Sequence, residues 1–439
     1  MKMYHLLKPA CFLALMCMVT IAFGQKKKKE KKTFERSPRQ ELVYANKSYL
    51  PAIKTVQFYP SGKESRLPVY ALGSADQLLL SFDDLRADVR NYYISIEHCN
   101  MDWTPSRTSV LDYVQGFNED RIDKFTAPMG TLQTYTNYTI SFPTENIKPK
   151  LAGNYLLKVY EDADKDRLVL TQRFYVMNNL VNVSSTIQQS TQVALRMQNQ
   201  KMNVTLKTGL TINNPQRDLN VVVKQNQRPD YQMQLQTPSF VAANEFRYNN
   251  PETLDFKGNN EFRYIDIRSF RFASDGVSSV TIDSIAHITA QIDEDKTGQT
   301  YGGTFDENGR FYIRNRDHEE QQNMGDYAEV TFSLKTEPTI NGKIYIVGGF
   351  NDYARSPENQ LSYNTDLGLW QVKLKLKQGL YDYDYVLEDT NGKVQTDRFS
   401  GSHFQTGNDY QILIYNRRMG TYWDELVGFS ETSIHNKHN

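Results

Sequence analysis

Apolar and polar residues alternate with period two through almost every segment of this 439-residue chain beyond residue 40. The clearest case is residues 372–377 (VKLKLK), in which a valine and two leucines alternate with three lysines. Successive side chains of a β-strand point to opposite faces, so this pattern predicts a half-buried strand with its lysines in solvent. Residues 78–82, 92–96 and 155–160 also have the composition of strands. The pattern therefore predicts a chain that folds almost entirely into strands.

Turn-forming residues separate these segments at intervals of about ten residues, a spacing typical of β-sandwiches. Examples are residues 59–62 (YPSG), 213–215 (NNP) and 391–392 (NG). Parallel βαβ units would need helices between the strands, and no segment keeps a helical period over three turns. We therefore predict an all-β protein built of tandem immunoglobulin-like β-sandwich domains.

The charge balance limits the class of partner. The chain has 51 Lys and Arg against 51 Asp and Glu, so its formal net charge is zero. Attraction to nucleic-acid phosphates needs an excess of basic residues, which argues against a nucleic-acid partner. The 28 Tyr and 22 Phe favour strands, and tyrosine also favours hydrated protein interfaces.

The first 24 residues have the order of a signal peptide. A basic start precedes an apolar stretch, and Ala22 and Gly24 are the small residues that a signal peptidase reads, which predicts cleavage before Gln25. A retained membrane anchor is the alternative, but the apolar run of about 14 residues is short of the ~20 that a membrane helix needs. The N-terminus therefore predicts export.

A lysine-rich leader follows, for which we predict disorder over residues 25–40. Its first four lysines are Lys26, Lys27, Lys28 and Lys29. Like charges at this density repel each other and stay solvated. The leader is either a solubilising tail or a weak electrostatic contact with an anionic surface.

Changes in composition divide the rest of the chain into three predicted units. Residues 41–180 form an N-terminal β-sandwich, residues 181–335 a middle unit of one or more sandwiches, and residues 336–428 a compact C-terminal sandwich, before a flexible tail at 429–439. The run NEFRY occurs at 244–248 and again at 260–264. Two copies this close predict neighbouring strands, since a solenoid needs at least three repeats.

No motif predicts catalysis, a metal or a cofactor. Residues 162–166 (DADKD) alternate like a calcium loop, but Arg167 stands where that loop needs glycine, so we predict a solvated hairpin turn. His98 and Cys99 are adjacent on a predicted strand and point to opposite faces, which predicts a buried structural cysteine and no nucleophile–base pair. We predict that the protein is not an enzyme and has no small-molecule substrate.

The C-terminal unit resembles the early-set immunoglobulin-like sandwich that accompanies starch and glycogen enzymes. The resemblance rests on residues 343–351 (KIYIVGGFN), Trp370 and residues 379–387 (GLYDYDYVL). Aromatic rings of that family stack on sugars, and Tyr353 stands where the first such ring usually lies. A glycan-binding protein is therefore the alternative function.

Several runs in the first unit together resemble the plug protein family of the type IX secretion system of Bacteroidota. They include residues 53–60 (IKTVQFYP), 67–85 (LPVYALGSADQLLLSFDDL), 92–106 (YYISIEHCNMDWTPS) and 135–143 (YTNYTISFP), and residues 261–272 (EFRYIDIRSFRF) extend the likeness. The resemblance implies a non-enzymatic periplasmic protein, peripheral to the outer membrane. It also implies a partner, the very large outer-membrane β-barrel translocon, whose periplasmic opening the plug seals.

Six residues of these segments are the candidate interface: Asp83, Asp84, His98, Asp102, Trp103 and Tyr353. A third hypothesis, that the chain is itself an outer-membrane barrel, also fits alternating strands. The polar end at residues 433–439 and the many Pro and Asp residues within the candidate strands favour soluble sandwiches.

Overall fold

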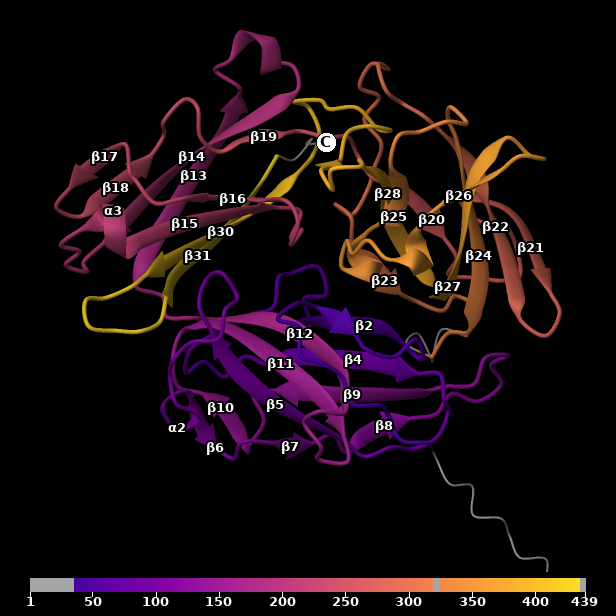
Figure 1. The fold of residues 1–439 in the computed structure, drawn as a ribbon, viewed down its shortest axis with the longest axis horizontal. Helices are drawn as coiled ribbons and strands as arrows, with labels where there is room; N and C mark the ends of the chain where they lie inside the picture. Colours follow the sequence, from indigo (N-terminus) through magenta and orange to yellow (C-terminus); the bar gives the residue numbers. More distant parts are fainter. Residues whose placement is uncertain (1–34, 319–323, 435–439) are drawn as a thin grey trace, which may run out of the picture. The chain divides into compact units, whose positions relative to one another are not determined.

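Strands with one apolar face pair into sheets and account for almost all of the secondary structure in the computed structural model, which describes residues 35–318 and 324–434. The described strands form three lobes, each with two main sheets around a core of buried apolar side chains (Figure 1). The prediction of an all-β fold with tandem sandwiches is confirmed. The predicted signal peptide, residues 1–24, and Lys26 to Lys29 lie outside the described residues.

The first lobe spans residues 37–178. One sheet has the order β1-β12-β11-β5-β7, with β3 parallel to β12, and the other has the order β2-β4-β9-β8. Rings from both sheets meet in the core, for example Phe142 and Phe174 with centroids 5.1 Å apart. The elements are β1 (Lys47–Ser48), β2 (Ile53–Pro60), β3 (Val69–Ala71), β4 (Leu78–Asp84), β5 (Tyr92–Cys99), α2 (Val110–Tyr113), β6 (Val114–Gly116), β7 (Asp120–Arg121), β8 (Lys124–Thr126), β9 (Thr136–Phe142), β10 (Ile147–Pro149), β11 (Gly153–Glu161) and β12 (Leu168–Met177).

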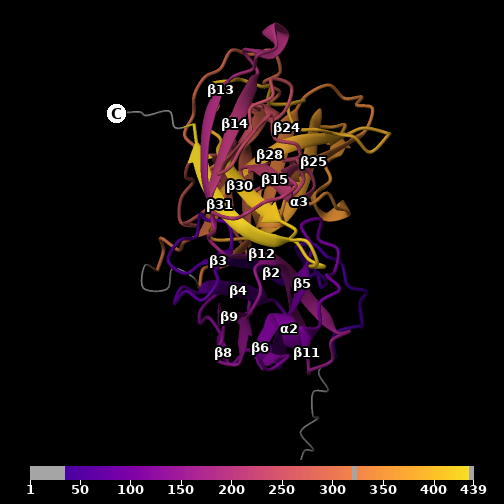
Figure 2. The ribbon, with the colours of Figure 1, turned by 90° about the vertical axis from the view of Figure 1, so that its left-hand side faces the viewer.

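The second lobe combines the middle of the chain with its C-terminal strands. Its sheets have the orders β13-β14-β18-β17, with β19 also on β14, and β16-β15-β30-β31. Both views show the yellow strands β30 and β31 beside the magenta strands of this lobe (Figure 1 and Figure 2). The elements are β13 (Val181–Gln189), η1 (Val193–Leu195), β14 (Asn199–Thr208), α3 (Pro215–Asp218), β15 (Leu219–Gln225), β16 (Gln232–Leu235), β17 (Phe240–Ala242), β18 (Glu245–Tyr248), β19 (Asp255–Lys257), β30 (Asp409–Asn416) and β31 (Glu425–Ser433).

The third lobe packs a sheet centred on β28 against a sheet of order β21-β22-β24-β27-β26. Strand β28 pairs with β20, β23, β25 and β29. The elements are β20 (Arg263–Asp266), β21 (Val277–Ile282), β22 (Ala286–Glu294), β23 (Phe311–Ile313), β24 (Tyr327–Lys335), β25 (Lys343–Val347), η3 (Gly349–Asn351), η4 (Pro357–Asn359), β26 (Ser362–Asn364), β27 (Leu369–Lys377), β28 (Gly379–Glu388) and β29 (Val394–Gln395).

The sheets cross the predicted domain boundary at residue 335 in both directions. Strands β20 to β24 precede the boundary but belong to the third lobe, whereas β30 and β31 follow it and belong to the second. Strand β15 is buried along its whole length and pairs with β30 from Leu219 opposite Asn416 to Gln225 opposite Tyr410. A fully buried strand needs a neighbour on each edge, and this one comes from nearly 200 residues away, which local composition does not reveal.

Three smaller predictions also differ from the structure. Strand β31 extends to Ser433, into the predicted tail, and the backbone N–H of Ser37, in the predicted disordered leader, donates to Glu161 at 2.7 Å. The two NEFRY copies are not neighbouring strands, since the first lies in β18 of the second lobe and the second leads into β20 of the third.

Strand β27 contains the alternating run that best predicted a half-buried strand. Lys373 and Lys375 are exposed, as expected, but Lys377 is only 1% exposed. The prediction is wrong at this lysine because its side chain does not end in solvent and instead reaches a carboxylate of the first lobe.

Candidate functional site at the junction of the three lobes

A buried ion pair joins the first lobe to the third. The ammonium of Lys377 lies 2.7 Å from Oδ2 of Asp83, and the two side chains are 1% and 0% exposed. The hydroxyl of Tyr327 donates to the same oxygen at 2.6 Å, and the amide of Asn137 donates to Oδ1 at 2.7 Å. The carboxylate is therefore paired and hydrogen-bonded from both lobes, which a buried charge requires.

Aromatic rings enclose this ion pair. Tyr135 and Tyr327 pack edge to face with centroids 5.4 Å apart, and the ammonium of Lys377 lies 4.3 Å from the centroid of Tyr135. Burial lowers the pKa of Lys377 and raises that of Tyr327 well above its ordinary value. We call Asp83, Tyr135, Asn137, Tyr327 and Lys377 the polar junction.

The contact between the first and second lobes is mostly apolar. Its buried cluster is Leu67, Cys99, Trp103, Leu156, Tyr175, Val222, Leu413, Tyr415 and Leu426, which we call the apolar junction. Two hydrogen bonds border it: the hydroxyl of Tyr415 donates to Asn154 at 2.7 Å, and the backbone N–H of Met101 donates to Asp424 at 3.1 Å. Burial of these apolar surfaces is the main contact between the two lobes, and an ion pair between Arg66 and Glu431 adds to it.

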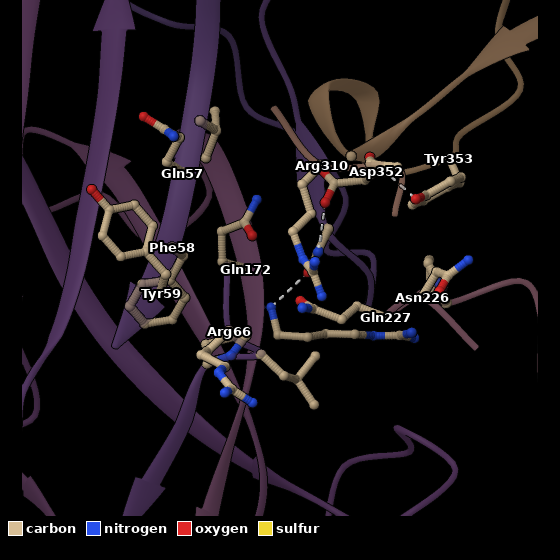
Figure 3. A pocket seen from close by; sticks show the side chains of 18 of the residues that line it. Gln57, Phe58, Tyr59, Arg66, Gln172, Asn226, Gln227, Arg310, Asp352 and Tyr353 are labelled. Carbon is tan, nitrogen blue, oxygen red and sulfur yellow. Dashed lines mark hydrogen bonds between the residues drawn. The ribbon is translucent and has the colours of Figure 1, made fainter. Parts of the chain in front are cut away.

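A cavity of about 150 Å³ lies where the three lobes meet, and we call it the junction cavity (Figure 3). Each lobe supplies part of its lining: Phe58 and Gln172 come from the first, Asn226 and Gln227 from the second, and Arg310 and Asp352 from the third. Most of the residues that line the cavity have polar or charged side chains, in contrast to the cores of the sandwiches.

Hydrogen bonds across the junction cavity fix its walls. The amide of Asn46 donates to Asp352 at 2.7 Å and its oxygen accepts from the backbone N–H of Arg173 at 2.7 Å, which links the first lobe to the third. Burial raises the pKa of Asp352 to about 6. The guanidinium of Arg310 forms an ion pair with Asp409, which links the third lobe to the second. All three lobes are thus held together around one small polar space.

The structure buries five of the six predicted interface residues within the chain. Asp83 belongs to the polar junction and Trp103 to the apolar junction, where the guanidinium of Arg173 lies 4.3 Å from the Trp103 ring. Asp84 forms an ion pair with Arg86 at 2.9 Å inside the first lobe. The buried residues are Asp83, Asp84, His98, Trp103 and Tyr353, and the exposed one is Asp102. Contact of these residues with another protein stays a prediction, with accessible surface mainly at Asp102.

Tyr353 lines the junction cavity and does not form an open stacking surface. Its ring is 5% exposed, the guanidinium of Arg228 lies 4.7 Å from its centroid, and its hydroxyl donates to the carbonyl of Gly309 at 3.2 Å. A ring that stacks on a sugar needs a free face, so the structure removes the aromatic platform on which the glycan-binding alternative depended.

His98 and Cys99 point to opposite sides of β5, as predicted. Cys99 is 0% exposed in the apolar junction and burial raises the pKa of its thiol to about 12, which confirms a buried cysteine. Nδ1 of His98 lies 2.9 Å from the hydroxyl of Ser106, and burial lowers the pKa of the imidazole to about 4. Residues 162–166 lie in the turn between β11 and β12, the predicted hairpin.

Sequence reasoning missed Lys377, Tyr327 and Arg310 as junction residues. Lys377 is separated from Asp83 by 294 positions in the chain, and no local pattern indicates which distant carboxylate a lysine meets. The sequence offered only a weak signal for burial of Lys377, namely its place at the end of the alternating run, directly before a glutamine and a glycine.

Over residues 35–318 and 324–434, no group of three or more His, Cys, Asp or Glu side chains is arranged to hold a metal ion. In the same described part of the chain, no helix has the length and apolar character needed to cross a membrane.

Comparison with known proteins supports the plug family. Residues 53–178, which make up most of the first lobe, match the model of the type 9 secretion system plug protein 1st domain. No curated protein matches the chain. The early-set resemblance of residues 336–428 is not confirmed by these comparisons and stays a prediction.

Among solved structures, a hypothetical protein from Parabacteroides merdae shares the fold over nearly the whole chain. It is 29% identical, the match covers 90% of this chain and 100% of that one, and the TM-score is 0.86. A partial N-terminal region of an enterococcal surface protein (8% identity, 91% and 97% coverage, TM-score 0.19) and dimeric latent PorU from Porphyromonas gingivalis (10% identity, 88% and 34% coverage, TM-score 0.14) are too dissimilar to carry an argument.

Proposed function

We propose that this protein is a periplasmic plug of the type IX secretion system, which binds the periplasmic opening of the large outer-membrane translocon barrel and seals it when no cargo is exported. The observation that carries this proposal is the match of residues 53–178 to the first domain of the plug protein. The role is steric, so a catalytic turnover by the purified protein would contradict it.

The way the lobes are joined supports a blocking role. A wide barrel leaves an aqueous channel that leaks solutes unless a body of sufficient breadth closes it. Here the polar junction and the apolar junction fasten the first lobe to both of the others through buried side chains. A body with such internal contacts keeps its shape under load better than lobes on free linkers.

The main test is deletion of the gene in a cell that carries the secretion system. We expect the envelope to become permeable to large antibiotics and dyes, and full-length protein expressed in the deletion strain to restore the barrier. We also expect the endogenous protein to co-purify with a very large outer-membrane barrel. Unchanged permeability together with no barrel among the captured proteins would refute the proposal.

The first lobe is the part that we infer to touch the barrel, because the family match lies there. Two apolar side chains of this lobe are exposed: Leu111, in α2, by 77% and Phe117, directly after β6, by 66%. We expect the double change Leu111→Ser and Phe117→Ser to reduce co-purification at least about tenfold, as loss of apolar anchors does at interfaces. The matched control is Val193→Ser with Met197→Ser, two exposed apolar residues of the second lobe, which should co-purify normally.

Both double variants should retain the fold, because surface substitutions usually change stability by less than about 0.5 kcal/mol. Equal loss in the two variants would show a general effect and reject the first lobe as the contact.

Peripheral contact of Lys26 to Lys29 with an anionic surface is a separate proposal. Exchange of these four lysines for glutamine should then weaken association with anionic vesicles without affecting capture of the barrel.

A further inference from the structure

Lys224 places an unpartnered positive charge in the junction cavity. The residue lies in β15, is only 4% exposed and lines the cavity, and its ammonium lies 5.7 Å from the centroid of the Tyr175 ring. Among the described residues, none accepts a hydrogen bond from this ammonium or forms an ion pair with it. Buried charges in proteins are normally paired, so this one calls for an acceptor from outside the chain.

Other donors near Lys224 also have free N–H groups. Gln411 is directly opposite Lys224 in the β15–β30 ladder, and its side-chain oxygen accepts from the backbone N–H of Gln227 at 2.7 Å. The amide nitrogen of Gln411 is buried and has no hydrogen-bond partner among the described residues, and the same holds for Nε of Arg310, which lines the cavity. Side chains directly opposite in an antiparallel pair share a face, so the Gln411 amide lies beside the lysine.

The charged groups of the lining are predominantly basic. The cations are Arg66, Arg173, Lys224 and Arg310, and the carboxylates are Glu64 and Asp352. Glu64 is already paired with Arg314 at 3.0 Å, and Asp352 accepts from Asn46. Arg173 donates to a backbone carbonyl, that of Tyr44, and burial lowers the pKa of its guanidinium. Arg66 is paired with Glu431 and Arg310 with Asp409, two carboxylates outside the lining. Of the remaining charges, the cations Arg173 and Lys224 outnumber the carboxylate of Asp352, so the lining keeps an excess of positive charge.

We infer that the junction cavity is a binding site for a small oxyanion, a carboxylate or a phosphate group. The volume of about 150 Å³ is well above the ~30 Å³ of one water molecule, so a polyatomic ion fits. Arg66 and Arg173 belong to the first lobe, Lys224 to the second and Arg310 to the third. A bound oxyanion thus contacts cations of several lobes and stabilises their association, independently of the proposed function.

The test measures thermal unfolding and calorimetric binding of the full-length protein with sodium phosphate or sodium acetate, against sodium chloride at equal ionic strength. We expect at least one of the two oxyanions to bind with a dissociation constant of about 1 mM or tighter and to raise Tm in proportion. Phosphate alone, acetate alone or both would each support the site and define its ligand. No binding by either would show that water fills the cavity and would overturn the inference.

Variants locate the binding. Lys224→Met removes the buried charge at similar length and should weaken binding at least about tenfold, whereas Lys207→Met, on an exposed lysine of β14, should leave it unchanged. Arg66→Gln, at a side chain that is 55% exposed and already paired with Glu431, should weaken binding by a smaller factor. If phosphate binds, crystals grown with selenate, a tetrahedral oxyanion like phosphate, should show an anomalous signal within hydrogen-bond distance of Lys224 Nζ. Equal binding by wild type and Lys224→Met, or, for a phosphate-binding protein, selenate only elsewhere, would refute the assignment.

Discussion

The polar junction and the apolar junction join the same first lobe to two neighbours by different physical means. In the polar junction, Asp83 and Lys377 are buried as an ion pair with a tyrosine and an asparagine on the carboxylate. In the apolar junction, side chains such as Val222 and Leu413 are buried without charge. Apolar burial is non-directional and tolerates small shifts, whereas a buried ion pair is favourable only when all its partners are in place.

This difference shows how one molecule can combine strength with specificity. The apolar junction contributes stability roughly in proportion to buried area, while the polar junction contributes little net stability but strongly disfavours any other arrangement of its charges. We therefore expect the two junctions to respond differently to substitution and to pH.

The largest effect is expected from Lys377→Met. The change leaves the Asp83 carboxylate buried without its counter-charge and should lower the free energy of unfolding by about 4 kcal/mol. Addition of Asp83→Asn should recover at least half of the loss, because the pair is then replaced by neutral groups. Urea unfolding followed by circular dichroism and tryptophan fluorescence measures both variants.

Lys373→Met is the matched control on the same strand, since its side chain is 66% exposed and paired with Glu329. Exposed ion pairs contribute less than about 1 kcal/mol, so this variant should be close to wild type. If Lys377→Met is equally mild, the ion pair does not hold the lobes in register.

Leu413→Ala tests the apolar junction. The side chain is 0% exposed, and its truncation should cost about 3 kcal/mol through lost burial and the cavity left behind. The loss should be the same at pH 5 and pH 8, because no titrating group is removed. Combined with Lys377→Met, the two losses should add within about 0.5 kcal/mol if the junctions are independent. A strongly non-additive result would show that the junctions act as one unit.

Asp382→Asn tests a buried carboxylate of the third lobe, near Arg310. Burial raises the pKa of Asp382 to about 7, so the folded protein holds this proton more tightly than the unfolded chain. Proton binding to Asp382 stabilises the folded protein. This contribution is complete below the ordinary pKa of an aspartate, near 4, and is lost as pH rises through 7. The variant should therefore be more stable than wild type by about 2 kcal/mol at pH 8 and lose this advantage at pH 4.

The substitution retains an oxygen for the backbone N–H groups of Glu307 and Gly309, which both donate to Oδ2 of Asp382. Asp366→Asn, at an exposed turn, is the control and should not change the pH profile of stability. Parallel pH profiles of Asp382→Asn and wild type would contradict the prediction.

His98→Gln should have the smallest effect and the opposite pH dependence. Burial lowers the pKa of His98 to about 4, so the unfolded chain binds this proton first. The neutral imidazole of His98 favours the folded protein. This contribution is complete above the ordinary pKa of a histidine, near 6.5, and is lost as pH falls toward 4. Wild type should lose about 1 kcal/mol between pH 7 and pH 5.5, and the variant should not. The control is His287→Gln, on an exposed histidine of β22, which should keep the wild-type dependence of stability on pH. If His98→Gln also keeps that dependence, a group other than His98 causes it.

The strands were largely predictable, and their assembly was not. Residues 78–82, 92–96 and 155–160 lie in β4, β5 and β11, and Cys99 is buried as expected. The boundary at residue 335 failed because β30 pairs with β15 across nearly 200 residues of chain. The candidate interface was chosen from the resembling segments, but a resemblance gives no burial, and most of its residues lie inside the chain.

The sequence by itself determined that the chain folds into sandwiches of strands. Alternation with period two is a local property that gives each strand one apolar face, whichever sheet then covers that face. Only the tertiary structure decided which strands share a lobe, that Lys377 meets Asp83, and that the Lys224 ammonium ends in a cavity where no described residue pairs with it. These outcomes depend on the register and choice of distant partners, which follow from the packing of whole sheets and not from the pattern of any one strand.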